Sequence, residues 1–251
     1  MTGPADSKGA DSRVVDSVLT GTPALLIHGF MSDARSDWAG WAEALAAVGR
    51  PVYLVDLPGH GSSPTPPSVE EARTGRIVDA LAEVISGRIA ADTGADRVDV
   101  IGYSLGARLA WELPARSAVQ IEHLVLGGIS PSEPFALIDF EQLHAFVESG
   151  VAPTDPFTAM MAGAIGRPGV NTAAVARCAE GLALEPFVPT AATAPPGPVL
   201  FAAGIDDQMS AGIDALIALV PDSRLVSVPG DHLGALASSE FRTAVIAFLE
   251  E

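Results

Sequence analysis

The chain has almost no cysteine or lysine. Its 251 residues include one cysteine, Cys178, and one lysine, Lys8. A single cysteine excludes an intramolecular disulfide and a cysteine-rich metal site. No apolar run approaches the roughly 18 residues of a membrane-spanning helix. The first residues are polar and lack the hydrophobic core of a secretion signal. We therefore expect a cytoplasmic protein without membrane contact.

Positive charge is also scarce. The chain carries 14 basic and 31 acidic residues, a net charge of −17, and the acidic residues are scattered. Nucleic acids and anionic membranes are bound through basic patches, so the charge argues against both partners. Hydrophobic residues make up 48% of the chain, enough for a folded core. We expect a small-molecule partner and a monomer or homodimer.

Apolar runs alternate with helical patterns along most of the chain. Continuous apolar runs are typical of strands buried on both faces, and they predict strands at 13–19, 23–27, 51–56, 98–103, 121–127, 199–204 and 224–228. Helices are expected over 38–48, 68–93, from 105 to about 115, 209–220 and 238–250. This alternation predicts an α/β fold with a doubly wound, mostly parallel sheet.

The alternation breaks between 131 and 198. This proline-bounded segment contains two or three amphipathic helical patterns and no strand pattern; the helices are expected at 139–148, 156–165 and 172–184. An insertion of this kind between two strands predicts a helical cap over the carboxyl ends of the sheet. We thus expect a disordered tail at 1–12, a core domain at 13–130 and 199–251, and a cap at 131–198.

A nucleophile is predicted at Ser104. Residues 102–106, Gly-Tyr-Ser-Leu-Gly, fit the G-x-S-x-G pattern and lie between a predicted strand and a predicted helix. A serine on such a sharp turn needs small residues on both sides, so that strand and helix can pass closely. The helix N-terminus offers free N–H groups where an oxyanion would form.

A serine hydroxyl needs a base, and the base needs an orienting acid. Catalytic groups of doubly wound sheets collect at the carboxyl ends of strands. Asp206 and Asp207 follow the strand at 199–204, and His232 follows the strand at 224–228. The order serine, aspartate, histidine is the one expected for this topology. The other histidines are expected in structural or surface positions: His28 and His60 in loops, and His123 and His144 at the surface or in the cap.

Five segments together resemble the α/β-hydrolase superfamily, and they occur in the family's order: 28–30, 56–63, 102–106, 204–207 and 230–232. The resemblance implies about seven to eight strands, with a small cap inserted after the sixth strand of the fold. It implies Ser104 as nucleophile, His232 as base and Asp207, in preference to Asp206, as acid. The oxyanion hole would be formed by the backbone N–H groups of Phe30 and Leu105.

The chemistry implied is hydrolysis of a carboxylic ester or thioester through an acyl-enzyme. The substrate is expected to be small to medium and largely apolar, because phenylalanine, leucine and methionine are frequent in the cap. Tyr103 and Arg108 are the expected substrate-binding residues. No zinc-ligand spacing occurs and no G-x-G-x-x-G follows a strand, so neither a metal nor a cofactor is expected.

Two alternatives stay open. Residues 28–31, 37–38 and 102–108 also resemble the menaquinone-pathway SHCHC synthases, in which the same triad acts as a base on an anionic substrate. Arg108 would then hold a carboxylate, and Arg35, Arg167 and Arg177 are further candidates for that task. The third alternative is a ligand-binding protein that retains the triad without catalysis.

Overall fold

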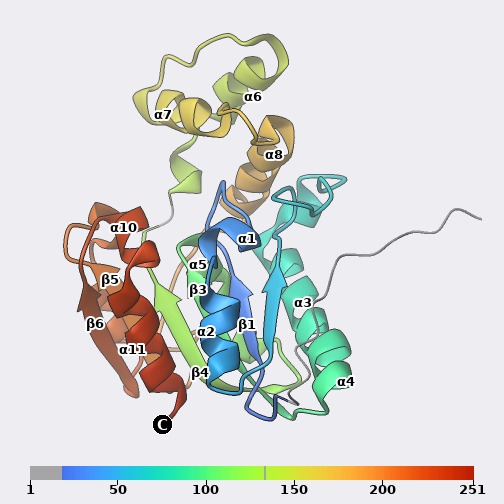
Figure 1. Cartoon of the computed structure of the whole chain (residues 1–251). Helices are drawn as coiled ribbons and strands as arrows, with labels where there is room; N and C mark the ends of the chain where they lie inside the picture. The colour runs from blue at the N-terminus through green and yellow to red at the C-terminus, as the bar shows by residue number, and fades with distance from the viewer. Residues whose placement is uncertain (1–18, 133) are drawn as a thin grey trace, which may run out of the picture.

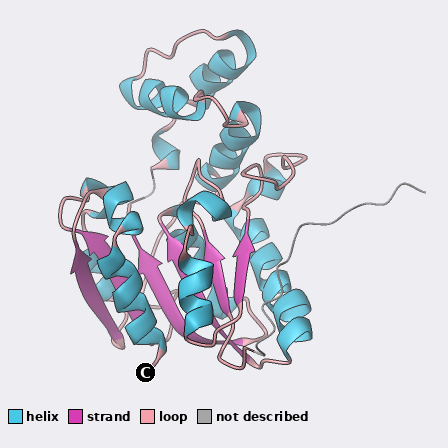
Figure 2. Ribbon diagram, in the orientation of Figure 1, coloured by secondary structure: helices cyan, strands magenta, loops and turns pink. Residues whose placement is uncertain are grey.

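The computed structural model describes residues 19–132 and 134–251, which form an α/β structure around one sheet (Figures 1 and 2). The sheet has six strands in the order β2-β1-β3-β4-β5-β6, and every neighbouring pair is parallel. The strands are β1 (Ala24–Ile27), β2 (Val52–Val55), β3 (Arg97–Tyr103), β4 (Gln120–Gly127), β5 (Val199–Gly204) and β6 (Ser223–Val228).

The described residues contain fewer strands than the seven to eight expected. The strand predicted at 13–19 lies outside the described residues except for Leu19, which is not in a strand, and the tail at 1–12 lies outside them entirely. The helical segment predicted as a cap follows β4, the fourth of the six strands.

Strand side chains alternate between two helical layers, as the two-residue period of a strand requires. In β1, Leu25 and Ile27 belong to the larger apolar cluster, whereas Ala24 and Leu26 belong to the smaller one. The larger cluster includes α3 (Thr74–Glu83), α5 (Leu105–Glu112) and α9 (Ile213–Ile217). The smaller includes α1 (Ala34–Asp37), α2 (Trp41–Ala47), α10 (His232–Ala237) and α11 (Ser239–Leu249). The sheet is therefore covered on both faces (Figure 1).

Several expected helices are shortened or divided. The helix expected at 38–48 is shortened to α2, because Gly40 at its N-cap has a φ of +75°, and the separate α1 precedes the expected range. The helix expected at 68–93 consists of four pieces: η1 (Glu70–Ala72), α3, the π-helical η2 (Val84–Ile89) and α4 (Ala90–Thr93). The expected elbow helix ends as the 3₁₀ turn η3 (Leu113–Ala115).

Two further helices differ near the predicted acid and base. In place of a helix at 209–220, the chain forms the 3₁₀ turn η5 (Gln208–Ser210) and the short α9. His232 begins α10 rather than lying in a loop, because the Asp231 carboxylate accepts the Gly234 N–H and caps that helix.

The segment between β4 and β5 forms the 3₁₀ turn η4 (Phe135–Leu137), α6 (Phe140–Ser149), α7 (Pro156–Ile165) and α8 (Thr172–Ala183). These helices stand beyond the carboxyl ends of the strands, with α8 nearest to the sheet (Figure 1). Side chains of η4, α6, α7 and α8 continue the larger apolar cluster of the core. No helix among the described residues is long and apolar enough to cross a membrane.

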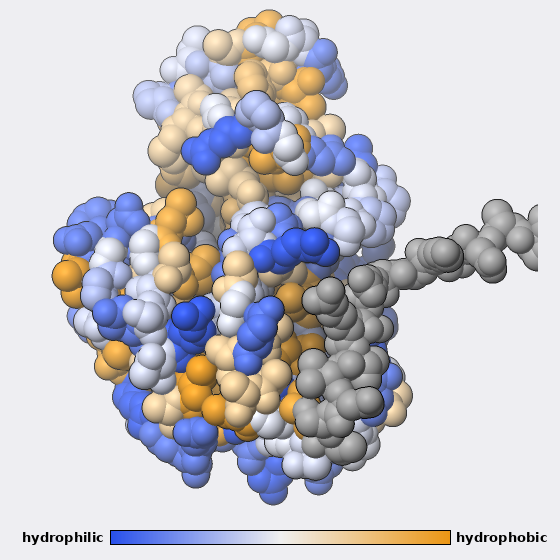
Figure 3. All heavy atoms as spheres, viewed as in Figure 1, coloured by the Kyte–Doolittle hydropathy of each residue, from blue (hydrophilic) through white to orange (hydrophobic). Residues whose placement is uncertain are grey.

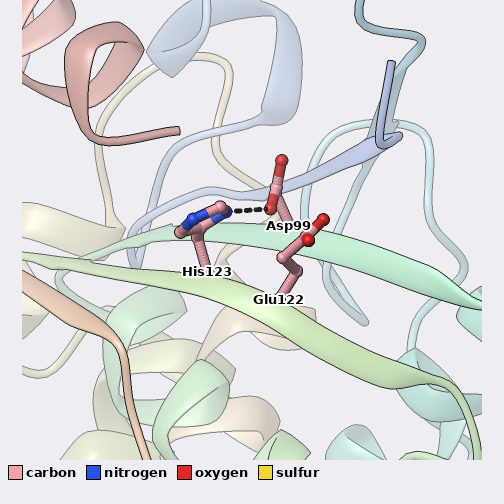
Figure 4. A group of neighbouring side chains, drawn as sticks. All are labelled: Asp99, Glu122 and His123. Atoms are coloured by element: carbon pink, nitrogen blue, oxygen red, sulfur yellow. Dashed lines mark hydrogen bonds and ion pairs between the residues drawn. The ribbon is translucent and has the colours of Figure 1, made fainter. Parts of the chain in front are cut away.

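A buried charge cluster lies at the other end of β3 (Figure 4). Asp99 is fully buried, and its carboxylate accepts hydrogen bonds from Arg50 and, at 2.8 Å, from His123 Nδ1. The same guanidinium donates to the backbone oxygen of Leu249 in α11. His123, expected at the surface or in the cap, is buried in β4 because it pairs with Asp99 across the two strands. The cluster thus joins β3, β4 and the end of α11.

Replacing Asp99 is expected to destabilise the fold. Asp99→Asn leaves the buried Arg50 charge without its counter-ion, and breaking such a pair costs about 3 kcal/mol or more. The free energy of unfolding, measured by urea denaturation, should fall accordingly. Asp79→Asn is the control, because the Asp79–Arg116 pair is half exposed and should contribute less than about 1 kcal/mol. Equal effects of the two substitutions would contradict this account.

Candidate active site

Ser104 lies at the turn between β3 and α5 with a φ of +54° and a ψ of −117°. The turn depends on two glycines. A Cβ at Gly102 would lie 2.4 Å from the backbone oxygen of Gly106, and a Cβ at Gly106 would lie 2.0 Å from the backbone oxygen of Ile27. The Ser104 N–H is held by the Gly127 oxygen at 2.8 Å. The strained serine is therefore fixed by its backbone, and its side chain is partly exposed.

Near Ser104, two backbone N–H groups donate no hydrogen bond to any described residue. Leu105 is the first residue of α5, so its N–H has no acceptor within the helix. The Phe30 N–H, in the loop after β1, likewise donates to no described residue. The loops meet here, since a Cβ at Gly29 would lie 3.4 Å from the Cβ of Ser104. This is the arrangement predicted for an oxyanion hole.

His28 holds the loop that carries Phe30. The Leu57 N–H donates to His28 Nε2 at 2.9 Å, so the proton is on Nδ1, which donates to the Gly29 oxygen at 2.7 Å. Burial lowers the pKa of His28, which keeps the ring neutral in this role. Burial and the neighbouring His28 lower the pKa of His60 to about 4, and its neutral ring packs edge-on against Phe30 at 5.5 Å.

Asp37 is a second support for this loop that the sequence analysis did not assign. Its carboxylate accepts the Gly29 N–H at 2.8 Å and also the Ser32 hydroxyl. The Gly29 N–H is thereby occupied, and the next N–H, that of Phe30, is the one left available. The signals in the sequence were a carboxylate eight residues after Gly29 and the resemblance of 37–38 to the SHCHC synthases, neither of which indicated this contact.

His232 and Asp207 are adjacent although 25 residues separate them. His232 Nδ1 lies 2.9 Å from Asp207 Oδ2. Asp207 is 8% exposed and is itself oriented by the Ser210 hydroxyl at 2.6 Å and the Met209 N–H at 2.9 Å. With Nδ1 engaged, Nε2 is the nitrogen of His232 available for proton transfer.

The two candidate acids occupy different environments. Burial acts to raise the pKa of Asp207, but hydrogen bonds from His232 and Ser210 outweigh it and bring the pKa below its ordinary value. Asp207 is therefore a carboxylate at neutral pH. Asp206 is exposed, and its side chain makes no hydrogen bond to another described residue. The structure thus brings Asp207, and not Asp206, to His232.

The two expected substrate-binding residues are buried. Tyr103 is 2% exposed, and its hydroxyl donates to the backbone oxygen of His232 at 2.7 Å. Arg108 is 5% exposed, and its Nη2 donates to Thr74 Oγ1, the Leu182 oxygen and the Glu185 oxygen at 2.8, 3.3 and 2.6 Å. These hydrogen bonds join the end of α8 to α3 and α5. Both side chains therefore have structural partners in positions where substrate contacts were expected.

The other candidate arginines lie on two helices and in one loop. Arg35 is exposed on α1, and Arg167 is exposed between α7 and α8. Arg177, on α8, donates to the Pro66 oxygen at 2.6 Å.

The surface has two hollows away from the candidate catalytic residues. One, of about 450 Å³, is lined by residues within 114–124 and 195–198. The other, of about 350 Å³, is lined by residues within 54–63 and 77–88. Neither hollow is lined by Ser104, Asp207 or His232.

One group among the described residues offers converging metal-ligand atoms. Asp99, Glu122 and His123 bring such atoms within 4.8 Å of one another (Figure 4). The Asp99 oxygens already accept hydrogen bonds from Arg50 and His123. The Glu122 oxygens accept from Thr22 and Arg97. Because a guanidinium occupies the position that a cation would take, we assign this group to stability.

The fold and the residues at its carboxyl edge define the class of protein. A sequence model of the α/β hydrolase fold family matches residues 22–158, more than half of the chain. The chain belongs to this family. The solved structure of MenH from S. aureus is similar over 92% of this chain and 94% of that chain, with a TM-score of 0.71 and 20% identity. At this identity the likeness concerns the fold.

Curated relatives include enzymes of different specificity. Epoxide hydrolase A of Mycobacterium tuberculosis is 29% identical over 194 residues, which cover 70% of this chain and 58% of that protein. The pimeloyl-[acyl-carrier protein] methyl ester esterase of Nitrosospira multiformis is 31% identical over 49% of this chain and 44% of its own length. The matches thus span about half the length of these relatives.

The two aspartates can be separated by mutation. Asp207→Asn should lower kcat/KM for an ester by about a thousandfold to ten-thousandfold, because the amide no longer orients the imidazole in its basic form. Asp206→Asn, a matched change one residue away, should leave kcat/KM close to that of the wild type. Steady-state kinetics at neutral pH measure both, and the reverse order of effects would refute the assignment of Asp207.

Asp37→Ala tests the support of the Phe30 loop. Without the carboxylate, the Gly29 N–H loses its acceptor and the Phe30 N–H is less well placed, so kcat should fall about tenfold or more. Asp37→Asn keeps an oxygen for that N–H and should retain more activity. Asp33→Ala is the control, since Asp33 caps α1 in the same segment. An unchanged kcat in Asp37→Ala would exclude this role.

Proposed function

We propose that the protein is a serine hydrolase that cleaves a carboxylic ester or thioester through an acyl-enzyme. The observation that carries the proposal is the joint placement of a strained Ser104, two N–H groups without partners, and the His232–Asp207 pair at the ends of β1, β3, β5 and β6. Acyl transfer needs a nucleophile, an oxyanion site and an oriented base, and each has a candidate here.

The proposed reaction follows from these positions. Ser104 Oγ attacks the carbonyl carbon while His232 Nε2 takes its proton, and Asp207 stabilises the resulting imidazolium. The oxyanion accepts hydrogen bonds from the N–H groups of Phe30 and Leu105. Collapse of the tetrahedral intermediate expels the alcohol or thiol, which receives the proton from His232. Water then releases the acid by the same steps in reverse.

A serine nucleophile favours acyl substrates over epoxides, although a curated relative is an epoxide hydrolase. Attack of Ser104 on an epoxide carbon would give an ether, which water does not cleave under physiological conditions. Attack on an ester gives a new ester on Ser104, which the oxyanion site and an activated water can hydrolyse. Turnover through a covalent intermediate is therefore consistent with ester or thioester substrates.

Exposed apolar side chains next to the acid and base support an apolar substrate. Ile205 and Met209 flank Asp207 and are 69% and 59% exposed, and Leu233 follows His232 with 69% exposed. The helical segment between β4 and β5 also has hydrophobic residues at its surface (Figure 3), and its Leu137 and Met160 are 65% and 58% exposed. The net charge of −17 also disfavours anionic substrates. We propose a small to medium neutral ester, a monomer or homodimer, and a cytoplasmic location.

The lyase alternative has less support. The fold of MenH is similar, but the carboxylate-binding role then required of Arg108 competes with its hydrogen bonds to α3 and α8. A lyase using Ser104 within a basic triad forms no acyl-enzyme. A non-catalytic binding protein forms none either and turns over no ester. Detection of the covalent intermediate therefore distinguishes the hydrolase from both alternatives.

The experiment combines labelling and turnover. A fluorophosphonate should label the wild type at Ser104, as mapped by mass spectrometry, and should not label Ser104→Ala. Rapid quenching with p-nitrophenyl butyrate should trap a butyryl adduct on Ser104, and rates over graded acyl lengths should define the size of the site. Labelling without any ester turnover or adduct would favour the lyase, and the absence of both would favour a binding protein.

A further inference from the structure

Tyr103 connects the nucleophile turn with the helix that carries His232. It is the last residue of β3 and precedes Ser104, and it is 2% exposed. Its hydroxyl donates to the backbone oxygen of His232 at 2.7 Å, across 129 residues of sequence. The two ring centroids are 5.2 Å apart. One buried side chain thus contacts both the main chain and the ring of the candidate base.

Two glycines at the end of β4 provide the space for this contact. A Cβ at Gly127 would lie 2.6 Å from Tyr103 Cδ2. A Cβ at Gly128 would lie 2.7 Å from Tyr103 Cε1 and 2.9 Å from His232 Cε1. On another side the Tyr103 ring packs against Phe241 of α11, with centroids 5.7 Å apart. The ring is therefore confined, and its hydroxyl has a defined direction.

The Tyr103 hydroxyl stays a hydrogen-bond donor at the pH values at which the enzyme works. Burial, followed by the negative charge of Asp207, raises the pKa of Tyr103, so the phenol stays protonated wherever the enzyme works. A buried hydroxyl without an acceptor is unfavourable, and the His232 oxygen is the acceptor that the fold provides. The hydrogen bond therefore persists across the pH range in which the imidazole changes its charge.

Resting on the proposed serine hydrolase function, we propose that Tyr103 is a positioning residue for His232. Asp207 restrains the imidazole through Nδ1, but this bond alone leaves the main chain of His232 free to shift with the first turn of α10. The Tyr103 hydroxyl restrains that main chain. Together the two bonds hold both the ring and the main chain of His232, and because Tyr103 and Ser104 are consecutive in the chain, the Tyr103 bond fixes the base relative to the nucleophile.

Tyr103→Phe tests this role, because it keeps the ring that fills the space beside Gly127 and Gly128 and removes only the donor. The rate of fluorophosphonate labelling and kcat should both fall about fivefold to tenfold, the effect of losing one hydrogen bond. KM should not change, because no contact with substrate is lost. Tyr53→Phe is the matched control: Tyr53, the other tyrosine, lies on the edge strand β2.

Two results would overturn the proposal. One is a kcat and labelling rate equal to those of Tyr53→Phe. The other is a rise in KM at constant kcat, which would indicate the substrate contact that the sequence predicted. Thermal unfolding of both variants separates positioning from lost stability. If Tyr103 positions His232, the Tyr103→Phe protein should react slowly with the fluorophosphonate and with esters even well below its melting temperature, where it is fully folded.

A double mutant tests whether Tyr103 acts through His232. In the Asp207→Asn background the imidazole is already misoriented, so adding Tyr103→Phe should slow labelling less than it does in the wild type. An equal factor in both backgrounds would show that the tyrosine acts independently of His232, against the proposal. Failure of the proposed function looks different, because the wild type itself would then turn over no ester and form no acyl adduct, whether or not the fluorophosphonate labels it.

Discussion

The close approach of β1, β3 and α5 is the constraint on which the rest of the structure depends. Gly102 and Gly106 allow the helix to start within contact of the strands, and any side chain at either position would overlap backbone atoms. This packing forces Ser104 into a positive φ and leaves the Leu105 N–H without a partner in the helix. The nucleophile and one oxyanion donor are thus consequences of how the sheet and helix pack.

The parts of the fold that local pattern determines could be predicted from the sequence. Strands β1 to β6 lie at the apolar runs that predicted them, and β1, β3, β4 and β5 are mostly buried, whereas the outer strands β2 and β6 are largely half-buried or exposed. Helix boundaries were less predictable, since α2 begins only after Gly40, whose φ of +75° belongs to the folded backbone and does not show in the apolar pattern. Ser104 was predicted from its pattern and flanking elements, and Asp206, Asp207 and His232 from their places after strands, with only the family resemblance favouring Asp207 over Asp206.

Contacts between distant segments could not be predicted in the same way. The Tyr103 hydroxyl finds its acceptor 129 residues later, and the Asp37 carboxylate is recognised as a support only when the loop around Gly29 is seen folded. His123 was expected at the surface because nothing local pairs it with Asp99. The signal in the sequence was that Asp99 and His123 each lie within an apolar strand pattern. Such pairs depend on strand order, which local periodicity does not encode.

The helical segment between β4 and β5 is hydrogen-bonded to the rest of the structure along one side. Arg108, Glu185 and Arg177 supply hydrogen bonds that join α8 and the residues after it to α3 and to the loop following β2. No comparable hydrogen bond joins α6, α7 or α8 to the region of β5, β6 and α10 among residues 19–132 and 134–251. These hydrogen bonds therefore lie on one side of the segment, and none of them reaches the region of the candidate acid and base, where Ile205 and Leu233 are exposed.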